Sequence, residues 1–172
     1  MAEELKIRIR DYKKVEENLI RLGAKFSEEI DVVDTYFKQP VGEVLKITEE
    51  NRGNFFVNLK SKNGKFEIVK YEPIDDVQKT KNELTKKFGI KWILKKKRRF
   101  FYFKNYKINI NLVENVGEFL IVEGENLAKE IITEKLKIKN PEFVTVSFDE
   151  LRRLSCVMLS VASLPHSSCR LT

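Results

Sequence analysis

The stretch EELKIRIR, residues 3–10, alternates apolar and charged side chains. Successive side chains of an extended strand point to opposite faces, so one face of this stretch is apolar and carries Leu5, Ile7 and Ile9. The other face is charged and carries Glu4, Lys6, Arg8 and Arg10. The stretch therefore predicts a two-faced β-strand, and it leaves open which face points inward.

Later stretches repeat this alternation. Their polar positions are Lys46 and Thr48, Asn58 and Lys60, Lys65 and Glu67, and Asn109 and Asn111. If the sheet closes into a barrel, one face of every strand lines the lumen, and the polar faces converge on a charged interior. If the sheet belongs to a sandwich, the charged faces point to water. Alternation alone favours the sandwich.

The composition is that of a soluble globular protein. The chain has 172 residues, of which 42% are hydrophobic and 34% are charged. No apolar run approaches the roughly 20 residues that a membrane span needs, and Glu3 and Glu4 stand where a secretory signal would have basic residues. We therefore expect a cytoplasmic protein that does not bind membranes. Abundant Lys, Glu and Ile beside scarce Gln favour a thermophilic source.

The formal net charge of +7 favours anionic partners such as nucleic acid, phosphate compounds or acidic lipid. A lysine-rich surface without a specific partner explains the charge equally well. Nucleic acid is the weaker candidate partner, because it would rest only on nonspecific contacts of an outward basic face.

The last 18 residues, 155–172, differ from the rest of the chain because they contain no Lys, Asp or Glu and hold Cys156, His166 and Cys169. The chain has no Cys-x-x-Cys pair and no other histidine, which argues against a zinc site, a redox motif or a histidine-dependent triad. We expect one domain over residues 1–154 and a C-terminal extension over 155–172, of cloning or read-through origin or poorly ordered. The alternative is a final helix that continues FDELRRL.

Two stretches predict helices, DYKKVEENLIRLGAKF from Asp11 and DDVQKTKNELTKKFG ending at Gly89. An Asp precedes each apolar-periodic run and a Gly follows it, as in capped helices. The helix exits LGAKF and FGIKW share the order Gly, one residue, Lys, aromatic, which suggests two related halves. Further on, NLAKEIITEKL predicts a short helix, and Ser147 with Glu150 predicts a capping box before the last helix.

Taken in order, these strands resemble the CYTH family, also called triphosphate tunnel metalloenzymes. The resemblance covers residues 1–154 and rests on an ordered set of short motifs, since none is specific alone. They are Glu4 and Lys6 of AEELK, DTYF (34–37), LKIT (45–48), VNLK (57–60), KFE (65–67), KKKRRF (95–100), VGEFLIVEG (116–124) and SFDELRRL (147–154).

The resemblance implies an α+β fold, an eight-stranded antiparallel β-barrel or tunnel with flanking helices and two related halves. The charged strand faces would then point into the tunnel. The implied function is binding of a nucleoside triphosphate, thiamine triphosphate or tripolyphosphate, which is hydrolysed or cyclised with Mg²⁺ or Mn²⁺. The alternative is a polyanion- or nucleotide-binding module without turnover. The oligomeric state stays open, with a homodimer as one option.

The resemblance also implies site residues. Lys6 and Arg98 are the candidate catalytic groups. The candidate substrate-binding residues are Lys6, Arg8, Lys46, Lys60, Lys65, Lys96 and Arg98. The candidate metal ligands are Glu4, Glu67 and Glu123. The face taken by Lys96 and Arg98 depends on strand register, because a slip of one residue would turn Lys95, Lys97 and Arg99 inward instead.

Several positions depart from the family pattern. Where the family has acidic residues, this chain has Ala2, Asn111 and Ile121, and where the family has arginines, it has Lys46, Thr48 and Lys65. Lysine keeps the charge of arginine but loses its paired contacts to phosphate. Lost carboxylates weaken a metal site, so these departures are the reason for expecting reduced activity and for keeping the binding-module alternative.

Overall fold

We describe a computed structural model that places residues 3–62 and 65–161, with the side chains of Glu3, 61–62, 65–67 and 157–161 left aside. The elements in chain order are β1 (Glu3–Ile9), α1 (Tyr12–Arg21), β2 (Lys25–Phe37), β3 (Glu43–Glu50), β4 (Gly53–Lys62), β5 (Lys65–Pro73), α2 (Val77–Phe88), β6 (Ile90–Phe103), β7 (Tyr106–Val113), β8 (Gly117–Gly124), the π-helical turn η1 (Ile131–Lys135), β9 (Glu142–Phe143) and α3 (Phe148–Val161).

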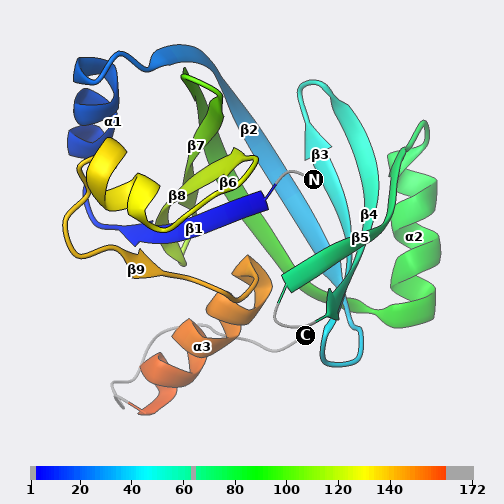
Figure 1. Ribbon diagram of the computed structural model, residues 1–172. Coiled ribbons are helices and arrows are strands. Elements are labelled where there is room, and N and C mark those ends of the chain that lie inside the picture. The colour runs from blue at the N-terminus through cyan, green and yellow to red at the C-terminus, as the bar shows by residue number, and fades with distance from the viewer. Residues whose placement is uncertain (1–2, 63–64, 162–172) are drawn as a thin grey trace. The chain divides into compact units, whose positions relative to one another are not determined.

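Within the described residues, nine strands form one antiparallel sheet in the order β5-β4-β3-β2-β6-β7-β8-β1-β9 (Figure 1). The α+β class and the antiparallel sheet are thereby confirmed, while closure of the sheet into a tunnel stays a prediction. The described residues form two compact units, one within Met1–Asp31 and Lys96–Thr145 and the other within Val32–Lys95 and Val146–Thr172. We call them unit 1 and unit 2.

The core of unit 1 lies on the apolar face of its strands. Ile7 and Ile9 of β1 join apolar residues of β6, β7 and β8, and α1 and η1 cover this face (Figure 1). Leu19 is the fully buried residue of α1. The apolar face of EELKIRIR is therefore the one that packs against the helices, and its charged face is the opposite one.

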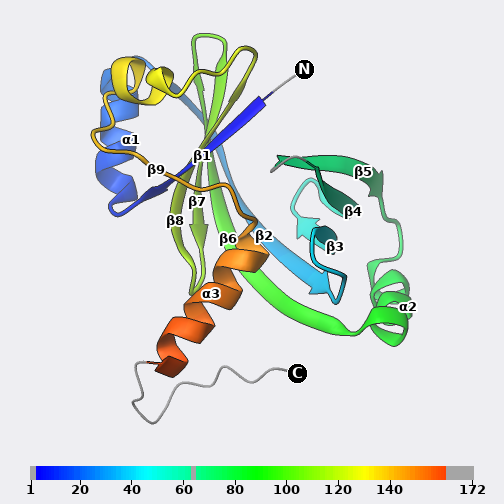
Figure 2. The same ribbon diagram turned by 60° about the horizontal axis from the view of Figure 1, so that its bottom comes forward.

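Unit 2 has its own apolar cluster. Phe37, Leu45 and Ile47 of β2 and β3 pack against residues of α2, which lies beside the strands (Figure 2). Both α1 and α2 begin and end as predicted. The carboxylates of Asp11 and Asp76 accept hydrogen bonds from the first turns, and Gly23 and Gly89 follow the helices with positive φ.

The structure differs from the predicted elements in three places. Residues 131–135 form a π-helical turn rather than a helix over 126–136, and the positive φ of Asn126 and Lys137 interrupts regular helix on either side. The short strand β9, which pairs with β1, was not predicted. The final helix α3 runs from Phe148 to Val161 and so crosses the expected boundary between residues 154 and 155. Residues 162–172 of that extension lie outside the described residues, as do residues 63–64.

The packing of α1 gives a direct test of this core. Leu19 is fully buried and Ile20 is 53% exposed on the same helix. We expect Leu19→Ala to lower the free energy of unfolding by about 2–5 kcal/mol, because it leaves a cavity, and Ile20→Ala to change it by less than about 0.5 kcal/mol. Urea unfolding followed by circular dichroism measures both. Equal losses in the two variants would contradict the described burial.

Candidate active site

The register of β1 against β8 places charged residues on one face of unit 1. Glu4 lies directly opposite Glu123, and Lys6 lies opposite Ile121. On the other side of β8, Lys107 of β7 is also opposite Glu123. Residues directly opposite each other in antiparallel strands share a face. Strand β6 continues this face, because Arg98 lies opposite Asn111.

We call this surface the polar face of unit 1. Its residues are Glu4, Lys6, Arg8, Lys96, Arg98, Lys107, Asn109, Asn111 and Glu123. It brings together six of the ten predicted site residues, which are Glu4, Lys6, Arg8, Lys96, Arg98 and Glu123.

Lys46, Lys60, Lys65 and Glu67 belong to unit 2. Lys107, Asn109 and Asn111 are on the face but were not among the predicted site residues.

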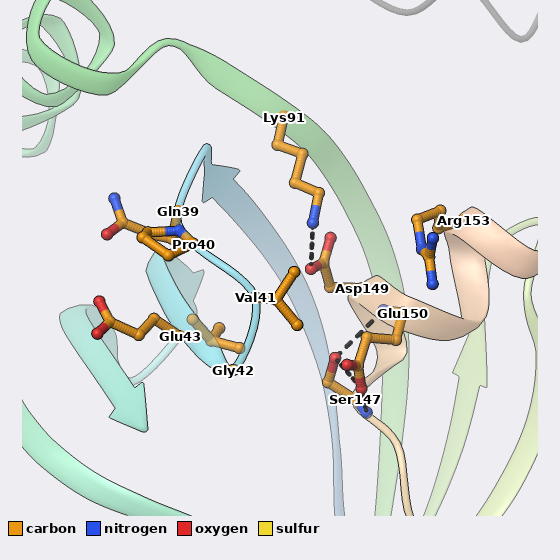
Figure 3. A pocket seen from close by; sticks show the side chains of 11 residues that line it. Gln39, Pro40, Val41, Gly42, Glu43, Lys91, Ser147, Asp149, Glu150 and Arg153 are labelled. Atoms are coloured by element: carbon orange, nitrogen blue, oxygen red, sulfur yellow. Dashed lines mark hydrogen bonds and ion pairs between the residues drawn. The ribbon is translucent and has the colours of Figure 1, made fainter. Parts of the chain in front are cut away.

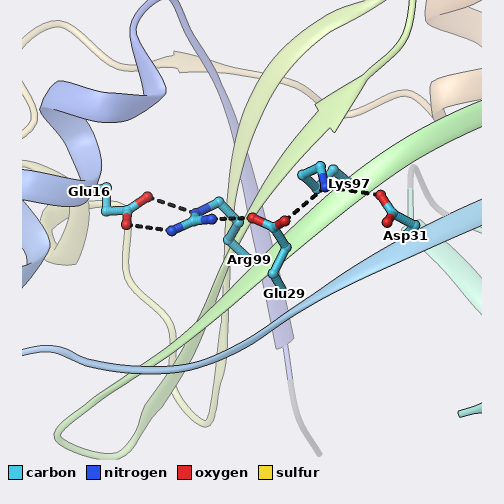
Figure 4. Close-up of polar contacts among 5 residues, drawn as sticks. All are labelled: Glu16, Glu29, Asp31, Lys97 and Arg99. Carbon is cyan, nitrogen blue, oxygen red and sulfur yellow. Dashed lines mark hydrogen bonds and ion pairs between the residues drawn. The ribbon is translucent and has the colours of Figure 1, made fainter. Parts of the chain in front are cut away.

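The basic run of β6 divides between two faces. Lys97 and Arg99 lie on the side of α1, where the Lys97 ammonium contacts the carboxylates of Glu29 at 2.8 Å and Asp31 at 3.1 Å. The Arg99 guanidinium binds Glu16 of α1 at 2.6 Å and also pairs with Glu29 (Figure 4). Lys96 and Arg98 alternate with these residues and so take the polar face, which resolves the register question left by the sequence.

The carboxyl group of Glu4 has an unusual environment. Its side chain is exposed to water, yet the protein atoms around it raise the pKa above its ordinary value, chiefly through desolvation. Lys6 acts in the opposite direction, the like charge of Glu123 raises the pKa further, and Arg98 and Lys96 lower it. Glu4 is therefore close enough to all four charged residues to be influenced by each.

The two arginines of the face differ in how they are held. Arg8 donates to the carbonyl oxygen of Val116 at 3.2 Å, pairs with Glu142 at 3.4 Å and lies over the ring of Phe119. The guanidinium of Arg98 stacks over the ring of Phe100 at 4.8 Å, and its buried Nε atom has no hydrogen-bond partner among the described residues. Buried donors in folded proteins normally have a hydrogen-bond partner, so a bound acceptor would satisfy the Nε–H group of Arg98.

Both carboxylate oxygens of Glu123 lie near polar side chains of β7. Its Oε1 atom accepts a hydrogen bond from Asn109 at 2.9 Å, and its Oε2 atom lies 3.8 Å from the ammonium of Lys107. Lys107 is a cation of the site that the sequence analysis missed. The alternation of YKININ could have found it, because Lys107 stands two residues before Asn109.

The acidic residues of the face suit a hard divalent cation that is bound partly by carboxylates and partly by phosphate oxygens of a substrate. Among the described residues, no group of three or more His, Cys, Asp and Glu could hold a metal ion by itself. Glu4 and Glu123 form a facing pair, and Mg²⁺ is typically held by one or two carboxylates together with substrate phosphates. The third predicted ligand, Glu67, has a side chain outside the described residues.

The predicted residues of unit 2 do not come together in the same way. The Lys46 ammonium pairs with buried Asp34 at 3.0 Å, and Thr48 donates to the same carboxylate at 2.6 Å. Burial raises the pKa of the Tyr36 hydroxyl well above its ordinary value, and Asp34 raises it further. Lys46 is therefore part of a buried polar network.

Lys60 differs from the expectation that it shares a face with Lys46. Val57 is opposite Lys46, and Lys60 is opposite Glu43, with which it pairs at 3.4 Å. Because side chains alternate along β4, Lys60 lies on the other face of the sheet. The side chain of Lys65 lies outside the described residues.

Unit 2 also contains a pocket between the β2–β3 turn and the start of α3 (Figure 3). The predicted capping box is present there, because the backbone N–H of Ser147 donates to Glu150 and the N–H of Glu150 donates to the Ser147 hydroxyl. Lys91 pairs with Asp149 at 2.8 Å. Since the start of α3 is already capped and this ion pair is formed, the polar face of unit 1 is the stronger candidate site.

The fold and the site together define an antiparallel sheet with one face that gathers lysines and arginines around a pair of facing carboxylates. No protein-family model matches the chain. It is 31% identical over 173 residues to a Methanocaldococcus jannaschii protein named "Putative adenylate cyclase MJ0240", covering 88% of this chain and 98% of that protein. The chain belongs to the CYTH, or triphosphate tunnel metalloenzyme, family.

Solved structures agree with this fold. The protein PH1012 of Pyrococcus horikoshii has a TM-score of 0.74 at 22% identity, with 88% of this chain and 99% of that chain covered. A Hippeastrum protein named "Putative adenylyl cyclase HpAC1", described as having a dominant triphosphatase activity, has a TM-score of 0.65 at 14% identity, with 96% and 98% covered. None of the helices within the described residues is long and apolar enough to cross a membrane.

The ion pairs on the α1 side predict a pH dependence of stability. Hydrogen bonds from Lys97, and then Arg99, lower the pKa of Glu29 below its ordinary value. A carboxyl group whose pKa is lower in the folded state stabilises the fold above its unfolded pKa, and this contribution is lost as the pH falls through the folded pKa. We expect Glu29→Gln to flatten the decline of the unfolding free energy in that acidic range.

Urea unfolding at a series of pH values measures this decline. High salt provides the control, because screening should reduce the difference between the unmodified chain and the variant. Identical pH profiles at low salt would contradict the described network.

Proposed function

We propose that the chain binds a triphosphate-containing anion on the polar face of unit 1 and, with a divalent metal ion, hydrolyses or cyclises it. The observation that carries the proposal is the convergence of Lys6, Lys96, Arg98 and Lys107 around the facing carboxylates of Glu4 and Glu123. Membership of the family supports it. The substrate classes are nucleoside triphosphates, thiamine triphosphate and tripolyphosphate.

The cations of the face would bind and orient the phosphate oxygens. Phosphoryl transfer requires little covalent chemistry from a protein, so positioning and charge neutralisation supply most of the catalysis. Arg98 suits a phosphate group best, because its planar guanidinium offers paired donors and its Nε lacks a partner among the described residues. Arg8, which pairs with Glu142, would contact the anion at its edge.

Glu4 and Glu123 would hold Mg²⁺ or Mn²⁺. The metal ion would supply charge neutralisation and activation of the attacking oxygen, from water in hydrolysis or from a ribose 3′-hydroxyl in cyclisation. The chain's own carboxylates fix the position at which the cation and the phosphates meet. Lys6, whose charge is felt at Glu4, would neutralise the anion beside that position.

The closed eight-stranded tunnel of the family remains part of the proposal. In unit 2, Lys46, Lys60, Lys65 and Glu67 are the proposed contributors. The pairing of Lys46 with Asp34 and the face taken by Lys60 make these two lysines weaker candidates than the cations of unit 1.

Hydrolysis and cyclisation use the same groups, and the name of the M. jannaschii relative is the specific reason to keep cyclisation as the second candidate. The two reactions differ in product. Hydrolysis of ATP or tripolyphosphate releases phosphate, whereas cyclisation of ATP releases pyrophosphate. Incubation with ATP, thiamine triphosphate and tripolyphosphate, each with Mg²⁺ or Mn²⁺, separates them. Binding without turnover of any of the three would refute catalysis and leave the binding-module alternative.

The neighbouring arginines of β6 form a matched pair for testing the site. We expect Arg98→Gln to lower kcat/KM by roughly 100-fold, as for the loss of one transition-state donor, with a nearly unchanged urea midpoint. We expect Arg99→Gln to keep kcat/KM within about twofold and to lower the urea midpoint, because it breaks the pairs with Glu16 and Glu29. Steady-state kinetics and urea unfolding of both variants provide the measurements. The opposite pattern would place the anion on the α1 side of the sheet.

Metal dependence tests the carboxylate pair. We expect a chelator to abolish turnover and added Mn²⁺ to restore it. In Glu123→Gln, the Mn²⁺ concentration for half-maximal rate should rise at least tenfold, because the pair loses one charged ligand. Glu125→Gln, a change on the same chain segment beyond the end of β8, is the control. Full activity in chelator would contradict the proposed role of the pair.

A further inference from the structure

Two buried asparagines stand beside the proposed metal ligand Glu123. Asn109 and Asn111 are 0% and 1% exposed, and both lie on the polar face of β7. The Nδ2 atom of Asn111 donates to Oδ1 of Asn109 at 2.5 Å, and Nδ2 of Asn109 donates to Oε1 of Glu123 at 2.9 Å. The three side chains therefore form a directed row of hydrogen bonds that ends at the carboxylate.

The direction of this row follows from the chemistry of the amide group. An asparagine side chain has an acceptor oxygen on one side and a donor nitrogen on the other. Because Asn111 donates to the oxygen of Asn109, the nitrogen of Asn109 is the atom turned toward Glu123. The reverse orientation would bring an oxygen against the carboxylate, which has no proton to donate when ionised.

The row leaves one carboxylate oxygen in a defined position. Oε1 of Glu123 is engaged by Asn109, whereas Oε2 lies 3.8 Å from the ammonium of Lys107, beyond hydrogen-bond distance. Glu4 is directly opposite Glu123 on β1. Because Oε1 already accepts the hydrogen bond from Asn109, Oε2 would be the oxygen that binds a cation shared with Glu4.

We infer that Asn109 and Asn111 are positioning residues, which hold the Glu123 carboxylate in the orientation that binds the divalent cation. The inference rests on the proposed function and adds two residues to it. Groups that orient a metal ligand typically contribute 10–100-fold to metal affinity. Asn111 acts through Asn109, because it fixes which end of the Asn109 amide faces the carboxylate.

Position 111 holds an asparagine in this chain, whereas the family has an aspartate there. An ionised aspartate cannot donate to Asn109. The Asn109 amide would turn its nitrogen toward the new carboxylate, and its oxygen would then face Glu123. Restoring the family residue in this chain should therefore weaken metal binding rather than strengthen it.

Titration with Mn²⁺ alone, followed by the electron paramagnetic resonance signal of the free ion, tests this statement. We expect Asn111→Asp and Asn109→Leu each to raise the Kd for Mn²⁺ by about 10–100-fold. Asn18 of α1 provides matched controls, because its amide donates to the carbonyl oxygen of Leu136 on the helix-covered side of unit 1. Asn18→Asp and Asn18→Leu should change the Kd by less than about twofold.

Three outcomes would overturn the inference or its basis. If Asn111→Asp binds Mn²⁺ as tightly as the unmodified chain, or more tightly, the positioning role is wrong. If the unmodified chain binds Mn²⁺ and Glu123→Gln loses it, while the asparagine variants bind normally, only the inference fails. If the unmodified chain binds Mn²⁺ neither alone nor together with a triphosphate analogue that resists hydrolysis, the proposed metal site and the inference both fail. Urea unfolding checks that each variant is folded, and Asn111→Asp, which is nearly isosteric, carries the test if Asn109→Leu does not fold.

Discussion

The antiparallel pairing of β1 with β8 is the constraint on which the site depends. This register places Glu4 opposite Glu123 and directs Ile7 and Ile9 toward the core of unit 1. A slip of one residue would exchange the two faces of β1, exposing the isoleucines and burying the charges under α1. The apolar core thus fixes the position of the polar groups, because only one register satisfies both faces.

Concentrating charge on one face of a sheet has a cost, since desolvated charges need partners. Unit 1 meets this cost by mixing signs and by placing aromatic rings under its cations, as with Arg98 over Phe100 and Arg8 over Phe119. At Glu4, desolvation raises the pKa of the carboxyl group and the neighbouring cations lower it, so compensation by charged neighbours is partial. A bound cation and phosphate would complete it, which links the electrostatics of the face to the proposed function.

Features determined by nearby residues could be predicted from the sequence. The ends of α1 and α2 followed from an Asp before and a Gly after each apolar-periodic run, and the polar face of β1 followed from its alternation. Features determined by strand register could not. The face of Lys60 depends on its pairing with Glu43, and the role of Lys46 depends on Asp34 on the adjacent strand. Alternation shows that a strand has two faces, but only register shows which faces of neighbouring strands coincide.

The proposed function requires a divalent cation and a polyphosphate to meet between Glu4 and Glu123. Anomalous diffraction from crystals grown with Mn²⁺ and a triphosphate analogue that resists hydrolysis tests it most directly. We expect an Mn²⁺ peak bonded to both carboxylates, with phosphate oxygens beside Lys6 and Arg98. An Mn²⁺ peak and a phosphate chain bound elsewhere, with this face empty, would contradict it.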